Sequence, residues 1–450
     1  MRTASTLCIV SALVACRPNV ATQTSTNATV LAIENVTVIP MDSDRVLPSH
    51  TVLIDGTRIV RIGPVDDVRV PRNARRIDGR GIYLAPGLAD MHVHIRSEMD
   101  FLSYLAFGVT TVFNLGGSYP EAPDLLRYRR ELAANERVGP TLYTSGPLLD
   151  GNPPIFAGVS EPVATPDEAV AAVRRQHQAG YDFVKTYNWL SPAAFNAAVA
   201  EAHTLGMPIG GHIPEKVSVD SALNARITLI AHGSAYLKGY LDSADRPDTM
   251  RLRSLAKRTR ETGTTVIPNL IYSATFASAL HDSAAAFADP EARFVAPAVL
   301  AAWRRTPPRM LLRWNGPPSV SYPLVQQLAR TLEQEDVGLL VGSDFPAMQG
   351  LFPGQGTVAE VRELEKAGLT RYQAFAAATV NAGAFVRRHV DTAARFGVIA
   401  PGFRADLLLL RSNPLDDLAA LANPVAIVVR GRYLSHDEIA RLREAALIPK

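Results

Sequence analysis

The stretch that decides the fold of this chain is Pro86-Gly87-Leu88-Ala89-Asp90-Met91-His92-Val93-His94. Because successive side chains of a β-strand point to opposite faces, two histidines separated by one residue lie on the same face of a strand. Two neighbouring imidazoles that face inward gain little unless one partner binds both, and neutral imidazole is a common ligand of divalent metal ions. Since such a pair also occurs by chance, the rest of the chain must show whether these histidines bind a metal.

Strand-like and helix-like patterns alternate after this stretch, which favours a parallel sheet with helical crossovers. We expect strands at 89–95, 110–115, 141–145, 183–187, 209–213, 229–232, 265–270 and 338–344. Thr165 and Ser191 are the expected N-caps of two intervening helices. The pattern predicts an α/β fold of the (β/α)8 TIM-barrel class. An open doubly wound sheet is the alternative, and it fits less well because no glycine-rich phosphate loop follows the first strand.

Two β-rich ends flank this middle, and together they predict a second, smaller domain. Short apolar runs and a hairpin turn at Asp55-Gly56 predict antiparallel strands in 29–84, and a similar texture returns in 397–435. We expect these two segments to form one composite β-sandwich beside a barrel in 85–396. Residues 272–320 are the expected insertion between the seventh and eighth strands.

The first sixteen residues are typical of an export signal, with Arg2 before an apolar run too short to span a bilayer. The sequence Leu13-Val14-Ala15-Cys16 resembles the lipobox of bacterial lipoproteins, in which Cys16 would be lipid-modified; an ordinary cleaved signal is the alternative. Residues 17–28 are the expected flexible tether. We therefore expect an exported protein on the periplasmic side of the bacterial cell envelope, attached to the membrane by a lipid anchor only.

The charge and cysteine content of the chain argue against some classes of partner and ligand. The net charge is +3 with both signs mixed along the chain, so no nucleic-acid partner is expected. The two cysteines, Cys8 and Cys16, both lie in the expected signal, so no disulfide and no thiolate ligand is expected in the folded part.

Polar residues at the ends of the expected strands predict the active site, because barrel enzymes react at the C-terminal ends of their strands. These residues are His92, His94, Lys185, His212, His232 and Asp344. Imidazoles, a lysine and a carboxylate that converge in a buried place are costly without a partner, and a metal site satisfies them together. The glycines beside His212 and His232 are expected to leave room for a ligand. For either histidine alone, a hydrogen-bonded core residue is the alternative.

With these residues in place, the chain resembles the amidohydrolase superfamily, in its imidazolonepropionase- and prolidase-like branch. The matching pieces are 86–94, 184–185, 211–212, 231–233, 342–344 and the closing stretch 402–407. The resemblance covers roughly residues 29–435. Its motifs are specific for the superfamily and not for a substrate.

The resemblance implies two divalent metal ions, expected to be Zn²⁺ from the ligand types. The two histidines of the first strand would bind one ion together with Asp344, and His212 and His232 would bind the other. Lys185 would be carboxylated and would bridge the ions, because a free lysine is a cation whereas its carbamate is an anion. A lysine paired with Asp344 in a one-metal site is the alternative.

The implied activity is hydrolysis of a carbon–nitrogen bond in a small amide, cyclic amide or dipeptide. A metal-activated hydroxide would attack the carbonyl, with Asp344 as general base and then acid. Tyr187, which shares a strand face with Lys185, is a candidate oxyanion donor or an aromatic filler, and Asn114 is a weaker candidate of the same kind. Asp90 would orient an imidazole from the second shell or serve as a buried structural carboxylate.

Three alternatives stay open. A mononuclear deaminase of the same superfamily would need a glutamate near the fifth strand, where Glu215 is the nearby candidate. A dipeptidase or lactonase specificity is also compatible, although residues 211–215 depart from the "HAHG" stretch of the dipeptidase members. A lipoprotein that binds a ligand without catalysis is the third.

Overall fold

The computed structural model describes residues 30–117, 119, 122–242, 246–312 and 318–447. The expected signal, the lipidation site Cys16 and the tether therefore lie outside the described residues. None of the helices in the described part of the chain combines the length and the apolar character that a bilayer crossing needs.

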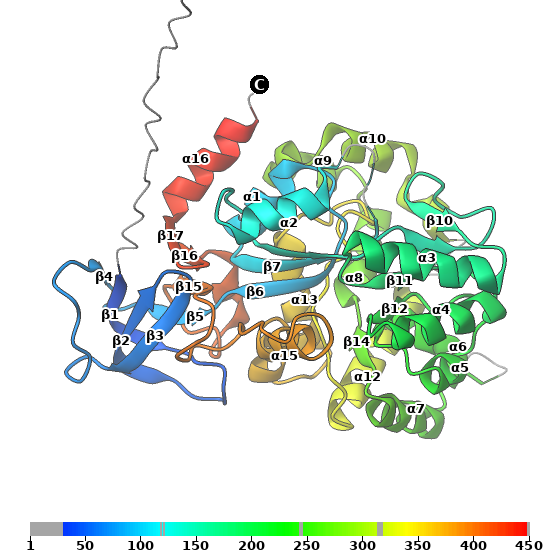
Figure 1. The fold of residues 1–450 in the computed structure, drawn as a ribbon, viewed down its shortest axis with the longest axis horizontal. Helices are drawn as coiled ribbons and strands as arrows, with labels where there is room; N and C mark the ends of the chain where they lie inside the picture. The colour runs from blue at the N-terminus through cyan, green and yellow to red at the C-terminus, as the bar shows by residue number, and fades with distance from the viewer. Residues whose placement is uncertain (1–29, 118, 120–121, 243–245, 313–317, 448–450) are drawn as a thin grey trace, which may run out of the picture.

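Both ends of the chain contribute to one eight-stranded sheet, whose order is β17-β16-β15-β5-β1-β2-β3, with β4 paired to β1. Its strands are β1 (Leu31–Val38), β2 (Leu47–Asp55), β3 (Arg58–Pro64), β4 (Arg75–Asp78), β5 (Tyr83–Pro86), β15 (Leu407–Leu410), β16 (Ala426–Val429) and β17 (Arg432–Ser435). In Figure 1 the blue N-terminal strands and the orange-red C-terminal strands lie together at one end of the molecule. The composite sandwich itself stays a prediction.

The expected antiparallel pairing of the N-terminal segment is only partly right. The hairpin between β2 and β3 is present, and Gly56 takes the positive φ of +55° that its turn requires. However, β4 and β5 both pair with β1 in parallel. Since β3 also runs parallel to β1, the chain must cross back between β3 and β4 and cannot turn there in a hairpin.

The middle of the chain is an α/β fold with parallel sheets, as expected. One sheet has three strands, β6 (Leu88–Val93), β7 (Val109–Asn114) and β8 (Thr141–Thr144). The other has the order β10-β9-β11-β12-β13-β14. Its strands are β9 (Leu148–Asp150), β10 (Ser160–Pro162), β11 (Val184–Thr186), β12 (Ile209–Gly211), β13 (Leu229–Ala231) and β14 (Thr265–Ile267).

These two parallel sheets are joined by single bridges, so within the described residues they do not form one continuous closed barrel. One bridge pairs Ser145 with Phe183. At the other side, segment 338–345 replaces the expected eighth strand: Leu340 donates its N–H to Val266 O of β14 (3.0 Å), and the same segment also bonds to β6. The ladder is interrupted because this segment must also turn its backbone at its end, as the site geometry below shows.

Helices cover the parallel sheets, and their starts follow the sequence signals. Thr165 accepts a hydrogen bond from Glu168 N at the start of α3, and Ser191 accepts one from Ala194 N at the start of α4, so both expected N-caps are confirmed. The α-helices are α1 (Glu98–Ala106), α2 (Leu125–Ala133), α3 (Pro166–Ala179), α4 (Pro192–Thr204), α5 (Val219–Asn224), α6 (Leu237–Tyr240), α7 (Thr249–Thr262), α8 (Leu270–His281), α9 (Ala285–Ala288), α10 (Pro297–Arg305), α12 (Pro318–Gln334), α13 (Gln355–Lys366), α14 (Arg371–Ala377), α15 (Val380–His389) and α16 (His436–Ala446).

In the described part of the chain, four short 3₁₀ helices connect these elements. They are η1 (Gly233–Tyr236), η2 (Pro290–Phe294), η3 (Pro308–Leu311) and η4 (Leu418–Ala422). Within the expected insertion, Trp303 of α10 is buried and donates its indole N–H to Pro346 O (2.9 Å). The helices that follow β14 therefore pack directly on the loop after segment 338–345.

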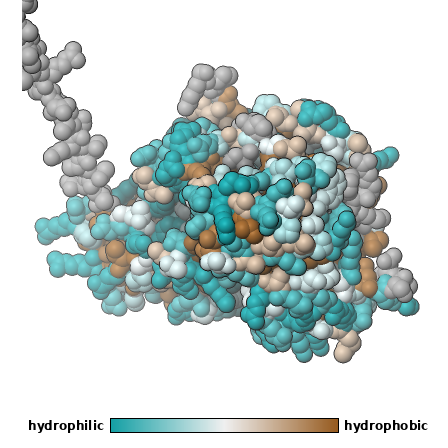
Figure 2. Space-filling view, turned by 45° about the vertical axis from the view of Figure 1, so that its right-hand side comes forward, coloured by the Kyte–Doolittle hydropathy of each residue, from teal (hydrophilic) through white to brown (hydrophobic). Residues whose placement is uncertain are grey.

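The interior between the parallel strands is filled by apolar side chains. A buried cluster takes residues from most of these strands and from α15, and includes Met91, Phe113, Phe183, Ile267 and Phe385. The face in Figure 2 is mostly hydrophilic, with small hydrophobic areas between. Because the strand interior is packed, the predicted site residues gather toward the C-terminal ends of the strands.

Candidate metal centre

Two predicted histidine ligands lie against the carboxylate of a third predicted ligand, Asp344. His92 ends the inward run of β6, His94 follows it, and Asp344 is held beside β6 by a hydrogen bond from its own N–H to His92 O (2.7 Å). Oδ1 of Asp344 lies 3.1 Å from Nε2 of His92 and 3.0 Å from Nε2 of His94. Because one residue separates the two histidines, their Nε2 atoms both lie beside the same oxygen of Asp344.

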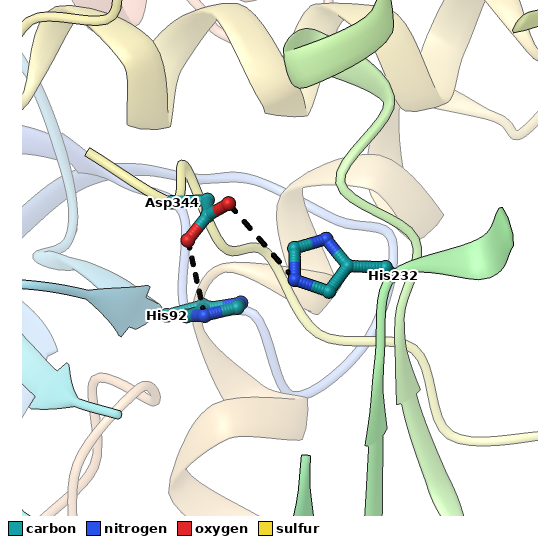
Figure 3. Close-up of side chains that lie close together, drawn as sticks. All are labelled: His92, His232 and Asp344. Carbon is teal, nitrogen blue, oxygen red and sulfur yellow. Dashed lines mark ion pairs between the residues drawn. The ribbon is translucent and has the colours of Figure 1, made fainter. Parts of the chain in front are cut away.

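His232 completes this group from the opposite side. It follows β13, and its Nε2 lies 3.9 Å from the other oxygen of Asp344. Figure 3 shows the carboxylate between the two imidazoles of His92 and His232, with one oxygen toward each. The ligand atoms of these three residues all lie within 4.8 Å of one another.

Lys185 enters the cluster from β11. Its Nζ lies 3.3 Å from Nε2 of His92, and its side chain is fully buried. Burial lowers the pKa of Lys185 to about 7. The lysine passes over Gly211, where a Cβ would lie 2.2 Å from Lys185 Cδ. The expectation that this glycine leaves room for a ligand is therefore wrong, because the lysine stem takes the space.

His212 joins through ring contacts. Its ring centroid lies 4.7 Å from that of His232, and the rings of His232 and His92 are 5.0 Å apart. Tyr187 stacks on the other face of His212 at 4.3 Å. The glycine after His232, expected to give a ligand room, instead accommodates core packing, because a Cβ there would lie 2.7 Å from Val325. All six predicted ligands therefore belong to one contiguous cluster.

The charge state of the cluster suits cation binding. Burial, together with the neighbouring Lys185 and histidines, lowers the pKa of His92 and of His212 well below the usual value, and burial lowers that of His232 to about 4. These imidazoles are neutral at pH 7 and keep a lone pair. Burial by itself would raise the pKa of Asp344, but His232, His94 and Lys185 around it hold that pKa below its usual range.

Two imidazole nitrogens of the cluster form no hydrogen bond within the described part of the protein. Among the described residues, Nδ1 of His92 and Nδ1 of His94 have no hydrogen-bond partner. Neutral imidazoles around one carboxylate, with lone pairs that the protein does not use, are the donor set that a divalent cation requires. The residues present therefore fit a metal site.

Asp90 and Asn114 hold backbone rather than imidazole rings. Oδ1 of Asp90 accepts the N–H groups of His92 (3.2 Å) and Ser343 (3.0 Å), and Oδ2 accepts the hydroxyl of Thr357 (2.6 Å). Asp90 thus aligns the strand of His92 with the residue before Asp344, and burial raises its pKa to about 6. This geometry favours the structural alternative for Asp90.

The amide of Asn114 is similarly occupied. Its oxygen accepts Ile95 N (2.9 Å), and its nitrogen donates to Gly117 O (3.1 Å) and to Thr144 Oγ1 (3.2 Å). With both ends bound to protein, Asn114 has no free donor for an oxyanion, so the expectation of that role is wrong. It fixes the chain just after His94.

Sequence reasoning missed two asparagines that hold the cluster in place. Oδ1 of Asn188 lies 2.6 Å from Nδ1 of His212, which fixes that ring. Oδ1 of Asn269 accepts His232 N (3.1 Å), and its amide donates to Gly342 O (2.7 Å). Asn188 follows Tyr187 and Asn269 follows β14, so a search for every polar residue at a strand end would have found both.

Three residues of this region have unusual backbone. His232, Asn269 and Asp344 have φ of 69°, 54° and 60°, a region that side-chain-bearing residues rarely adopt. Each follows the end of a strand-like segment and turns its side chain toward its neighbours. The turn at Asp344 also explains why segment 338–345 does not continue as a regular strand.

Helix α8 begins beside the cluster and is fixed by a buried acid. Glu360 of α13 accepts the N–H groups of Leu270 (3.0 Å) and Ile271 (2.6 Å). Burial raises the pKa of Glu360 to about 8. Tyr272 in the first turn of α8 lies with its ring 6.3 Å from that of His232. One helix, α13, therefore supports both Asp90, through Thr357, and α8.

Comparison with known proteins supports the fold and gives partial matches in sequence. The chain matches no protein-family profile. An adenine deaminase of Rubrobacter xylanophilus is 34% identical over 89 residues, which cover 20% of this chain and 15% of that protein. A dihydroorotase of Streptococcus pyogenes is 33% identical over 103 residues, covering 21% of this chain and 24% of the relative. The chain thus matches less than two thirds of either relative.

Solved structures are similar over nearly the whole chain. A putative prolidase from Bifidobacterium longum has a TM-score of 0.70 at 24% identity, covering 93% of this chain and 99% of that one. The bottromycin amidohydrolase has a TM-score of 0.72 at 24% identity, covering 93% and 90%. A Xaa-Pro dipeptidase has 0.68 at 19% identity, covering 90% and 100%. At these identities the chain shares the fold of prolidases and amidohydrolases.

Proposed function

We propose that the chain is a metal-dependent hydrolase of the amidohydrolase superfamily that cleaves a carbon–nitrogen bond of a small amide, cyclic amide or dipeptide. The observation that carries this proposal is the position of Asp344, whose Oδ1 lies 3.1 and 3.0 Å from the histidine nitrogens of β6. The similarity of fold to prolidases supports it. We infer further that the parallel strands and segment 338–345 correspond to a (β/α)8 barrel with this cluster at its mouth.

The cluster would hold two divalent cations, with Zn²⁺ expected from the imidazole and carboxylate ligands. His92, His94 and Asp344 would hold one, and His212 and His232 the other. When bound, such cations lower the pKa of water and polarise a carbonyl. Since His94, His212 and His232 are the partly exposed members of the cluster, a substrate would approach from their side.

Lys185 would bridge the cations as a carbamate. Starting from the ammonium form, Nζ would lose two protons and form a bond to the carbon of carbon dioxide, so a buried cation would become an anion with two ligand oxygens. The position of Nζ, 3.3 Å from Nε2 of His92, is compatible with this role. A free ammonium group at that place would repel both cations.

Asp344 would move the proton. One carboxylate oxygen accepts a proton from the attacking water, and the same group then donates it to the leaving nitrogen. Tyr187 would donate its hydroxyl proton in a hydrogen bond to the oxygen that becomes negative. Burial raises the pKa of Tyr187, so this hydroxyl keeps its proton across the physiological range.

A deaminase is the second candidate, because an adenine deaminase is among the relatives with a partial match. That chemistry would use Glu215 as its acid–base group. The side chain of Glu215 is exposed, whereas Lys185 is buried inside the cluster. The geometry therefore favours the hydrolase with the bridging lysine, and one bound ion without carbon-dioxide dependence would favour the deaminase.

Export and lipid anchoring through Cys16 remain our proposal from the sequence. Labelled palmitate should be incorporated when the full chain is expressed in bacteria, and Cys16→Ala should abolish the label. Incorporation into the variant at the wild-type level would contradict the anchor.

The experiment that tests the activity is a substrate screen of the zinc-loaded protein with dipeptides, N-acyl amino acids, cyclic ureides and lactones. We expect hydrolysis of at least one amide class, its loss after chelation, and its return with zinc and bicarbonate. Undiminished hydrolysis after every ion has been removed would contradict the proposal, as would a metal-loaded protein that cleaves no member of the panel.

A further inference from the structure

Two aromatic side chains are exposed where the fold gives no structural reason for it. Among the large hydrophobic residues of the described chain, Phe156 is 49% exposed and Trp189 is 43% exposed. Both lie in loops that follow strands of the parallel sheet, Phe156 after β9 and Trp189 after β11. The second loop starts at the strand end from which Lys185 and Tyr187 reach the candidate metal centre, and the first loop starts at the neighbouring strand β9, which pairs with β11.

Phe156 is connected to that centre through a continuous series of rings. Its ring centroid lies 5.8 Å from that of Tyr187, and Tyr187 stacks on His212 at 4.3 Å. His212 in turn lies 4.7 Å from His232. An apolar surface therefore runs from solvent at Phe156 to the imidazoles, without a charged side chain between them in this series.

The two loops are held in place by one buried carboxylate. Asp150 accepts the N–H groups of Gly151 (2.9 Å) and Ile155 (2.8 Å) in the first loop and of Trp189 (2.7 Å) in the second. A Cβ at Gly151 would lie 2.4 Å from Trp189 O, so the loops could not approach so closely with another residue there. Phe156 is thus presented on a backbone that is fixed before any ligand arrives, which lowers the entropy cost of binding.

The carboxylate oxygens of Asp150 are committed to these backbone N–H groups. What remains for a ligand at Phe156 and Tyr187 is aromatic surface. Aromatic pairs contribute binding free energy beyond that of the apolar area they bury. The chemistry that fits this surface is an apolar, preferably aromatic, substituent and not a charged one.

We propose that Phe156 and the ring of Tyr187 form a specificity subsite beside the metal centre, which takes an aromatic or bulky apolar substituent of the substrate. This inference rests on the proposed function, because the continuity of the rings with the metal centre identifies the occupant as part of the substrate. The preferred substrates are then amides with an aromatic side chain or acyl group.

The test uses two metal-chelating probes that differ only in their apolar part, acetohydroxamate and 3-phenylpropionohydroxamate. Their affinities for the zinc-loaded protein are measured by calorimetry, for the wild type, Phe156→Ala and the control Met250→Ala, which removes an even more exposed apolar side chain from α7. In the wild type the phenyl probe should bind about tenfold more tightly. That ratio should fall to about one in Phe156→Ala and persist in Met250→Ala.

Two results overturn the subsite alone: equal affinity of the two probes in the wild type, or a ratio that persists in Phe156→Ala. Absence of binding by both probes is a different result, since it contradicts the metal centre itself and removes the inference with it. A substrate panel gives the second readout, in which Phe156→Ala should raise KM for aromatic substrates more than for their alanine counterparts.

Discussion

Two buried polar clusters in the described part of the chain differ in how completely they are paired. At the contact between the eight-stranded sheet and β7 and β8, Asp406 is paired with Arg404, accepts Arg430 N (2.8 Å), and Arg404 donates to Thr111 Oγ1 (2.6 Å). The guanidinium of Arg430 reaches the side chain of Asn135 at 2.9 Å. Polar groups in this cluster find partners within the protein.

The metal-centre cluster is also buried, but its polar groups are incompletely paired. Three imidazoles lie beside a single carboxylate, a fourth packs against one of them, and two ring nitrogens have no partner among the described residues. Unpaired buried polar groups are costly, so such a cluster persists where it serves a ligand. The comparison teaches that burial of charge alone does not identify a site, whereas incomplete pairing does.

The largest expected effect tests the incompletely paired cluster. Asp344→Asn keeps the size of the side chain but removes the group that accepts a proton, so kcat should fall by about 10²–10⁴-fold. Zinc content, measured by mass spectrometry, should fall much less than activity. Asp336→Asn is the matched control, because Asp336 is exposed and has a similar positive φ of 57°. Near-normal kcat in Asp344→Asn would refute its role.

The next effect tests the fully paired cluster. Asp406→Asn removes the buried carboxylate that pairs with the guanidinium of Arg404, and breaking a buried ion pair in this way costs about 3–5 kcal/mol. Urea unfolding should show this loss of stability, with zinc stoichiometry unchanged in the folded protein. Asp416→Asn, at an exposed aspartate of the same C-terminal segment, should have no effect. Equal stability of the two variants would break the comparison.

A third buried group, Glu360, lies between these cases because its partners are backbone N–H groups. Its pKa is raised from 4.5 to about 8 by burial, so the unfolded chain releases this proton at lower pH than the folded protein. The contribution of Glu360 to stability is therefore fully present below about pH 4.5 and is lost as pH rises toward 8. Relative to Glu360→Gln, the wild type should lose up to about 1.4 kcal/mol per pH unit in that window.

Urea unfolding between pH 5 and pH 8 measures this difference. Glu261→Gln on α7 is the control, because Glu261 is exposed and should leave the pH profile of the wild type unchanged. A constant difference between wild type and Glu360→Gln across the range would show that the acid is ionised throughout.

The smallest effect concerns the fixing of one ring. Asn188→Ala removes the amide oxygen 2.6 Å from Nδ1 of His212, and loss of such a partner typically costs about 10–100-fold in metal affinity. Competition with a fluorescent zinc chelator measures this affinity. Asn196→Ala on the exposed face of α4 should match the wild type, and an unchanged affinity in Asn188→Ala would show that His212 is not a ligand.

Much of the fold follows from local signals in the sequence. The strand that bears His92 and His94, the parallel strands after it and the helix starts at Thr165 and Ser191 depend on period and capping, which are properties of neighbours in the chain. Segment 338–345 was expected as a strand because it is apolar. Its positive φ at Asp344 is imposed by contacts with β6 and β14, and apolar character alone could not reveal them.

The candidate site, like the fold, can be predicted only in part from local signals in the sequence. The six predicted ligands could be found because each lies at a strand end, and the architecture brings strand ends together. Thr357 and Glu360 could not, since they reach the cluster from α13, far along the chain, and carry no spacing signal. Asn114 has a strand-end position and still belongs to the supporting framework, because its partners are all protein atoms.

The left-handed turns at His232, Asn269 and Asp344 have a consequence for engineering and evolution. A side-chain-bearing residue in such a turn costs on the order of 1 kcal/mol, which glycine would avoid. A search that rewards heat resistance alone would favour glycine at these three positions. Such a search would enrich variants that are more heat-resistant but lack side chains of the candidate site. Thermostabilised variants should therefore be screened for turnover at every round.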